Sequence, residues 1–171
     1  KKNYRMKKIS LFFKKKVFIL KKKKNIDNDK FDNKTLNDIF SYYGTDKANK
    51  VKNQYDVNSK NLVGHGYAKF YEKHLSNYKY KNFNLLEIGT WYGASTASFA
   101  KYFPRANIFG IDRNFKFKYK SNRIKFLHCD LREKENLNIL KKKIQGKKFK
   151  IIIDDGSHIL SHIIKNIIFF I

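Results

Sequence analysis

A glycine turn between an apolar strand and a helix of small residues constrains the fold of this chain most strongly. It lies in the segment from Leu85 to Ser98, which reads LLEIGTWYGASTAS. Gly89 and Gly93 leave the turn without side chains, so the backbone can bend sharply there and lie close to a ligand. The spacing E-x-G-x-x-x-G differs from the dinucleotide fingerprint and from the P-loop. In an open α/β sheet, ligands bind at the carboxyl ends of strands, where this turn lies.

Three further apolar strands are expected, and an acidic residue stands at or just after the end of each. They cover Asn107 to Asp112, Ile124 to His128 (before Asp130), and Phe149 to Ile153 (before Asp154 and Asp155). Carboxyl ends of parallel strands meet at one edge of a sheet, so these acids are expected to lie together. The alternation of strands and helices predicts an α/β fold, a Rossmann-like, doubly wound and mostly parallel sheet with about four strands present.

The glycine turn resembles the first motif of class I S-adenosylmethionine (SAM) methyltransferases. With YGTDK at Tyr43 to Lys47 and IDDGSH at Ile153 to His158, the chain resembles the metal-dependent O-methyltransferases that act on macrolide sugars and related small molecules. The likeness covers roughly Asn37 to Ile171, and the motifs come in the same order. It implies transfer of a methyl group from SAM to a hydroxyl of a sugar or another small molecule. A family with cephalosporin-hydroxylase-like members shares part of the pattern.

The resemblance implies a SAM site at the strand ends. Asp112, at the tip of its strand, can accept hydrogen bonds from both ribose hydroxyls, and Asp130 suits the adenine edge. The expected cofactor-binding residues are Glu87, Gly89, Thr90, Gly93, Ser95, Asp112, Asp130 and Asp154. Asp154 can instead orient its loop or cap the helix expected from Ile159 to Phe170, for which Ser157 is an equally good N-cap.

Asp155 and His158 suit the chemistry of methyl transfer to a hydroxyl. A hard divalent ion such as Mg²⁺, held by carboxylate oxygens, can polarise a hydroxyl, which is otherwise a poor nucleophile. A histidine can remove the proton, because its pKa lies near neutrality. The resemblance assigns Asp155 as the metal ligand and His158 as the general base. His162 is expected to pack or to form a hydrogen bond, because no third zinc ligand is apparent nearby.

Residues 35–82 are expected to form an N-terminal helical segment with a lid. A helix from Leu36 to Tyr43, capped by Thr35, precedes the YGTDK motif. Tyr43, Thr45 and Asp46 of that motif can form a lid near the cofactor or substrate. The alternative is a helix-ending turn in which Gly44 is the C-cap. Residues 49–60 read as a loop.

The net charge of +25 suggests a polyanionic partner, but the composition argues against a specific one. The basic residues are mostly lysine, whereas arginine is the usual reader of phosphates and bases. We therefore expect no specific nucleic acid. Residues 1–24 are the most basic, and their two apolar runs are too short to span a bilayer. Residues 1–34 are expected to be a poorly ordered leader and linker, although weak contact of 1–24 with polyanions or anionic membranes is an alternative.

The remaining expectations concern the compartment and the extent of the domain. Cys129 is the single cysteine, so no intramolecular disulfide can form, which fits the cytoplasm. The SAM-binding domain is expected to span 83–171 and to be truncated, because the family pattern continues with an acidic pair on a further strand that completes the metal site. The alternatives are a non-catalytic truncated remnant, a related cephalosporin-hydroxylase-like enzyme, or an RNA-directed methyltransferase.

Overall fold

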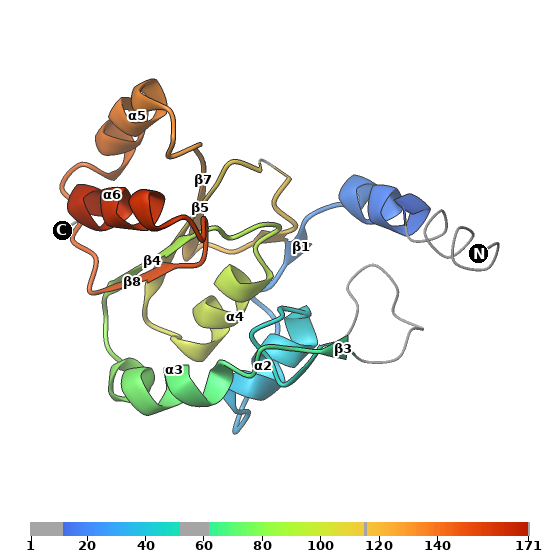
Figure 1. Cartoon of the computed structure of the whole chain (residues 1–171). Helices are drawn as coiled ribbons and strands as arrows, with labels where there is room; N and C mark the ends of the chain where they lie inside the picture. Colours follow the sequence, from blue (N-terminus) through green and yellow to red (C-terminus); the bar gives the residue numbers. More distant parts are fainter. Residues whose placement is uncertain (1–11, 52–61, 115, 171) are drawn as a thin grey trace.

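A parallel four-stranded sheet with the order β7-β5-β4-β8 forms the centre of the molecule (Figure 1). The computed structural model describes residues 12–51, 62–114 and 116–170. The strands are β4 (Asn84–Ile88), β5 (Asn107–Asp112), β7 (Ile124–His128) and β8 (Ile151–Asp154). Because β4 lies inside the sheet and the order reverses beside it, the sheet is doubly wound. The expected Rossmann-like α/β fold is confirmed.

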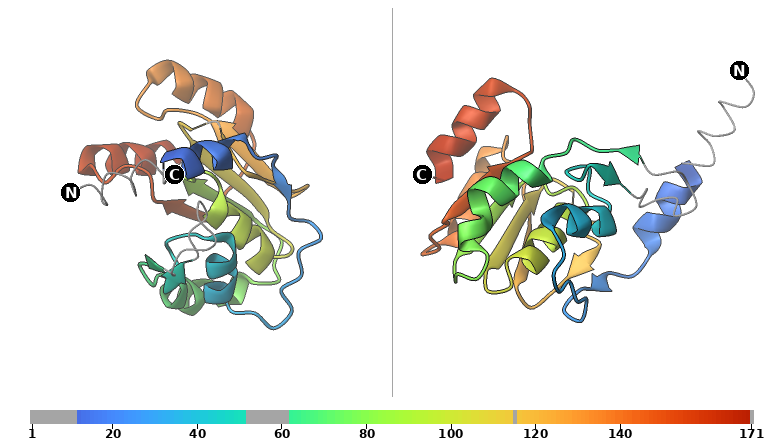
Figure 2. Two further views of the ribbon diagram at one scale, coloured as in Figure 1. Left: turned by 90° about the vertical axis from the view of Figure 1, so that its right-hand side faces the viewer. Right: turned by 90° about the horizontal axis from the view of Figure 1, so that it is seen from below.

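Helices cover both faces of the sheet (Figures 1 and 2). One face carries α2 (Leu36–Tyr43), α3 (Ala68–Leu75) and α4 (Ala94–Tyr102), and the other carries α5 (Lys134–Ile144) and α6 (Leu160–Phe170). Alternate residues of β4 enter two separate cores, since neighbouring side chains of a strand point to opposite faces. Leu85 packs with the α2 and α4 residues, and Leu86 packs with residues of α5 and α6.

Helix α2 is fixed at both ends. The Thr35 side chain accepts a hydrogen bond from the Asp38 amide and the Asp38 carboxylate accepts one from the Thr35 amide, which makes a capping box. Gly44, with a φ of 76°, ends the helix in the left-handed conformation. The Leu36 amide donates to the Glu72 carboxylate of α3 over 2.6 Å, so the two helices are joined. The expected helix, its cap and its terminating turn are confirmed.

Short strands attach outlying segments to this frame. β1 (Lys24–Asn25) pairs in parallel with β6 (Tyr119–Lys120), and β2 (Lys50–Val51) pairs antiparallel with β3 (Leu62–Val63). A 3₁₀ turn, Ser76–Tyr78, follows α3. Residues 25–34 read as a polar linker in the sequence, yet their Ile26 is fully buried in the same core as α2. Residues 1–11 of the expected leader and 52–61 of the expected loop lie outside the described residues.

Two element boundaries differ from the expectation. The last strand begins at Ile151, because Phe149 turns its ring against Phe109 (centroids 5.3 Å apart) before the chain enters the sheet. The last helix begins at Leu160, one residue later than expected. Within the described ranges, no helix combines the length and the apolar character needed to cross a membrane.

Candidate functional site

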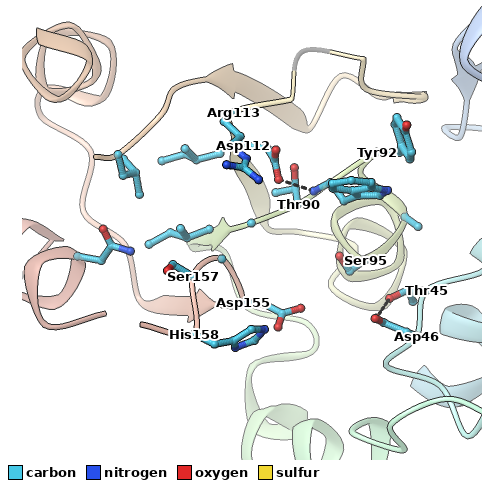
Figure 3. A pocket seen from close by; sticks show the side chains of 18 of the residues that line it. Thr45, Asp46, Thr90, Tyr92, Ser95, Asp112, Arg113, Asp155, Ser157 and His158 are labelled. Carbon is cyan, nitrogen blue, oxygen red and sulfur yellow. Dashed lines mark hydrogen bonds between the residues drawn. The ribbon is translucent and has the colours of Figure 1, made fainter. Parts of the chain in front are cut away.

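A cavity of about 790 Å³ opens at the carboxyl edge of the sheet (Figure 3). Its walls come from the turns after β4, β5, β7 and β8 and from the segment after α2. Of the expected cofactor residues, those that line it are Gly89, Thr90, Ser95, Asp112 and Asp130. Asp155 and His158 line it as well. The strand ends therefore converge on one cavity, as their order in the sequence indicated.

The glycine turn after β4 needs its glycines for backbone packing. Gly89 has a φ of 81°, and a Cβ atom there would lie 2.4 Å from the Asp155 carbonyl oxygen and 2.4 Å from the Gly156 Cα. Gly93 has a φ of 90°, and a Cβ atom would lie 2.5 Å from the Phe126 ring. Both positions combine a left-handed backbone with a close neighbour, so a larger residue would strain the turn. Gly89 thus lets the turns after β4 and β8 touch.

Asp112 holds the glycine turn to the end of β5. Its carboxylate accepts hydrogen bonds from the backbone amides of Trp91 and Asn114, each over 2.6 Å. Trp91 has a φ of 52°, which is strained for a residue with a side chain. The Trp91 ring is exposed, whereas Tyr92 is buried and its ring meets Phe18 edge-on at 5.4 Å. Asp112 is 9 % exposed and lines the cavity, where a carboxylate oxygen can accept further bonds.

At the cavity wall, a buried lysine links two carboxylates from distant parts of the chain. Lys47, the last residue of YGTDK, is 3 % exposed. Its ammonium forms an ion pair and hydrogen bond with Asp155 and lies 4.0 Å from Oε1 of Glu87. Glu87 is completely buried, and its other oxygen accepts a hydrogen bond of 2.5 Å from the Thr96 hydroxyl. Among the described residues, Oε1 of Glu87 has no hydrogen-bond partner, so the Lys47 charge is its compensation.

The two buried groups shift each other's protonation. Burial raises the pKa of the Glu87 carboxyl, although the Lys47 charge and the hydroxyls of Ser95 and Thr96 act in the opposite direction. Burial alone lowers the pKa of Lys47, but the charges of Glu87 and Asp155 outweigh it and leave that pKa raised. Lys47 is therefore the fixed positive charge of this cluster.

Asp130 is held by its own loop. The Arg132 side chain donates two hydrogen bonds to its carboxylate, one of 2.8 Å from Nε, and the Arg132 amide donates a third. These bonds lower the pKa of Asp130 to about 2, against a small opposing effect of burial. Asp130 lines the cavity as a permanently charged carboxylate at neutral pH, and Arg132 lines it too.

Asp154 ends β8 and Asp155 directly follows it, and their carboxylates bond to different elements, Asn166 of α6 and Lys47. The Asp154 carboxylate accepts hydrogen bonds from the Gly156 amide (3.0 Å) and from the Asn166 side chain of α6 (2.9 Å). Asp154 does not belong to the cavity wall, and these bonds match the expected alternative in which it orients the loop. Its assignment to the cofactor remains a prediction.

The turn after β8 and the start of α6 form a further part of the cavity wall, with Ser157, His158 and His162. The Ser157 hydroxyl bonds to the His162 ring over 2.9 Å and accepts from the Ile159 amide, so His162 has the hydrogen-bonding role expected for it. His158 is exposed, and Figure 3 shows it on the same turn as Asp155. An exposed imidazole beside the cavity can exchange a proton with a ligand. The roles of His158 and Asp155 remain predictions.

Four carboxylates line the cavity, those of Asp46, Asp112, Asp130 and Asp155. Among the described residues, however, no three His, Cys, Asp or Glu side chains are grouped as metal ligands. Asp155, the expected ligand, already pairs with Lys47. The described residues therefore offer separate carboxylates and no complete coordination shell. They fit an organic cofactor better, because the Thr90 hydroxyl lies buried at the cavity wall without a partner in the described structure.

Lys47 is the residue that sequence reasoning missed. Thr45 and Asp46 of the same motif line the cavity as expected, but the lysine beside them was given no role. The sequence offered one indication of a role for Lys47, its place in the YGTDK motif directly after the turn that ends α2. Its partners lie 40 and 108 residues further along the chain, so the sequence does not reveal them.

Comparison with known proteins agrees with this geometry. No family model matches the chain. Among curated proteins, mycinamicin VI 2''-O-methyltransferase of Micromonospora griseorubida is 31% identical over 106 residues, which are 58% of this chain and 26% of that protein. Demethylmacrocin O-methyltransferase of Streptomyces fradiae is 30% identical over 106 residues, again 58% and 26%. The chain spans about a quarter of the length of these relatives.

Solved structures give the same result. The MycE methyltransferase from the mycinamycin biosynthetic pathway, in complex with Mg and SAH, superposes with a TM-score of 0.63 at 27% identity, over 80% of this chain and 33% of that one. The complex of MycE with Mg, SAH and mycinamycin VI superposes with a TM-score of 0.60 at 28% identity, over 77% and 34%. The resemblance to the macrolide-sugar O-methyltransferases is confirmed.

Proposed function

We propose that this chain is the SAM-binding part of an O-methyltransferase that acts on a hydroxyl of a sugar or another small molecule. One observation carries the proposal: the glycine turn and Asp112 lie on one side of a single cavity, and Asp155 and His158 lie on another. The similarity to sugar O-methyltransferases supports the reaction type. A further relative, of Streptomyces olivaceus, is named as a 2'-O-methyltransferase of a rhamnosyl tetracenomycin C, and we take a sugar hydroxyl as the acceptor class from that name.

Each residue has a separate task in this proposal. Asp112 accepts hydrogen bonds from the ribose, while the turn around Gly89 and the Thr90 hydroxyl lie against the rest of the cofactor. When bound, SAM would supply an electrophilic methyl group, whose bond to the sulfonium sulfur breaks and leaves S-adenosylhomocysteine. His158 removes the proton of the acceptor hydroxyl as the new C–O bond forms, and a neutral imidazole is the form that can do so. Asp155 is the proposed ligand of a divalent ion, which would polarise the acceptor hydroxyl.

The first test is cofactor binding by calorimetry on the full-length protein. Asp112→Ala should weaken SAM binding by roughly 10-fold to 100-fold, as expected for the loss of hydrogen bonds to a charged group. Asp32→Ala removes an exposed carboxylate outside the cavity and should leave the affinity unchanged. A protein that binds no SAM would be the non-catalytic remnant, and unchanged affinity in Asp112→Ala would refute the site.

The second test is methyl transfer from labelled SAM to sugar hydroxyls, with and without a chelator. His158→Ala should retain SAM binding and lose at least about a hundredfold in rate, the usual effect of removing a general base. His74→Ala is the matched control, since that exposed histidine of α3 lies outside the cavity wall. Turnover that needs no SAM would indicate the hydroxylase-like alternative. A rate that survives the chelator would remove the metal from the mechanism.

A further inference from the structure

The described N-terminal segment is a short helix whose exposed side is apolar. Residues 12–20 are helical, and they project from the body of the domain (Figures 1 and 2). Four large apolar side chains on this helix are open to solvent: Phe12 (57 %), Phe13 (62 %), Val17 (56 %) and Leu20 (83 %). Single exposed apolar residues are common on protein surfaces, but four neighbours on one short helix need an explanation.

Helical geometry places these four side chains on one face. At about 100° per residue, they fall within an arc of roughly 140°. Phe18 and Ile19 fall outside that arc and are half-buried. The helix therefore has an apolar face that is exposed to solvent, and its half-buried residues Phe18 and Ile19 lie outside that face.

Contacts with the domain determine which face is exposed. The Phe18 ring meets Tyr92 of the glycine turn at 5.4 Å. The Lys118 ammonium donates hydrogen bonds to the carbonyl oxygens of Ile19 and Lys21, at the end of the helix. Lys118 is buried, so these bonds are shielded from water. The exposed arc consequently points away from the domain.

Lysines lie beside the exposed arc and, at Lys16, within it. Lys14, Lys15 and Lys16 lie within the helix and Lys21, Lys22 and Lys23 directly follow it, and all six are exposed. Nucleic acid would satisfy these charges but would leave Val17 and Leu20 in water. An anionic bilayer offers negative headgroups for the lysines and an apolar layer for the four side chains at the same depth. Long lysine side chains can reach the headgroups from within an apolar face.

We propose that residues 12–23, the helix of residues 12–20 with the three lysines that follow it, bind the surface of an anionic membrane. The helix lies in the plane of the headgroups, with Phe12, Phe13, Val17 and Leu20 inserted and the lysines at the phosphates. Binding through one short helix is weak and reversible, and salt weakens it further, because part of the attraction is between screened charges. This surface is independent of the proposed methyl transfer.

The experiment is co-sedimentation of the full-length protein with vesicles. Vesicles of phosphatidylcholine with phosphatidylglycerol should bind the protein, and vesicles of phosphatidylcholine alone should not. Replacing Lys14, Lys15 and Lys16 by Gln should weaken binding on the order of a hundredfold, from the contribution of each lysine near such a surface. The matched control replaces Lys141, Lys142 and Lys143 of α5, which are equally exposed, and should leave binding nearly unchanged.

The apolar variant decides between a membrane and any other polyanion. Phe13→Ser with Leu20→Ser should weaken vesicle binding at least tenfold, because it removes two inserted side chains. Val63→Ser, at a position 92 % exposed outside the helix, is its control. Thermal unfolding would verify that all variants fold. If the lysine variant loses binding but the apolar variant does not, the helix contacts polyanions through charge alone and the proposal is wrong. Equal loss in the α5 control would overturn it as well.

Discussion

The two faces of the sheet are stabilised in different ways. On the face of α2 and α4, the fully buried rings of Phe40, Phe99 and Phe103 pack around β4 and β5. On the opposite face, Asn166 is the buried residue of α6, while Ile168 is 75 % exposed. The turn after β8 is instead held by polar ties, Lys47 to Asp155 and Asn166 to Asp154. The side of the cavity proposed for the cofactor thus lies over a packed core, and the turn that carries His158 depends on hydrogen bonds and charge.

The largest effect should come from the packed face. Phe99→Ala removes a completely buried ring that contacts Phe40 and Tyr71, and it should lower the free energy of unfolding by about 3–5 kcal/mol. Phe169→Ala, on the half-buried end of α6, should cost about 1 kcal/mol, because less apolar area returns to water. Urea unfolding of both variants measures the difference. Equal losses would show that the two faces are packed alike.

The buried ion pair should come next. Lys47→Met leaves Glu87 buried without its compensating charge and should cost roughly 3 kcal/mol at neutral pH. Glu87→Gln in the same protein should restore part of that loss, since it removes the uncompensated carboxylate. A double-mutant cycle followed by urea unfolding gives the coupling. Strictly additive losses would mean that Lys47 does not compensate Glu87.

Lys47 also positions Asp155, and this role has its own signature. Lys47→Arg keeps the positive charge but places it on a longer, planar group. The variant should therefore retain much of the stability but change the position of the Asp155 carboxylate at the cavity. We expect SAM affinity to change less than the rate of methyl transfer, because Asp155 lies on the His158 side. If the rate of methyl transfer in Lys47→Met and Lys47→Arg falls only in proportion to the loss of stability, Lys47 does not position Asp155.

The smallest effect concerns acid. Arg132 lowers the pKa of Asp130 to about 2 from an ordinary value of 3.8. A lowered pKa means that the charged form is favoured in the folded state, so this contribution to stability is complete above about pH 4 and disappears as the pH falls toward 2. Asp130→Asn should therefore lower the free energy of unfolding at pH 7, by a small amount because the pair with Arg132 is partly exposed, and make it less dependent on pH between 4 and 2. Urea unfolding between pH 2 and pH 7 measures this. If the variant and the unmodified protein lose stability equally between pH 4 and 2, the Asp130–Arg132 contact is absent in solution.

The sequence predicted local features well and distant pairings poorly. The predicted boundaries of three elements agree with the structure: β5, β7 and the capped helix α2. The signals that set them, which are hydrophobic periodicity, capping residues and glycines, each depend on only a few neighbouring residues. Strand alternation could not divide the Asp154–Asp155 pair, because Asp155 lies beyond the end of β8. Lys47 could not be paired, because its partners are far away in the sequence. The burial of Ile26 was not predicted either, because a single isoleucine in a polar stretch gives no hydrophobic periodicity.

The contact between Gly89 and the turn after β8 has a consequence for synthesis of the chain. β8 begins about 65 residues after β4, which corresponds to several seconds at ordinary translation rates. During that time the glycine turn, Asp112 and Lys47 are already available, but the edge of β4 that β8 will occupy is open. The glycine turn and Asp112, on the proposed cofactor side of the cavity, are therefore synthesised before β8 and the turn that carries His158. A ligand that binds the first side early would assist the last strand in docking on the ribosome.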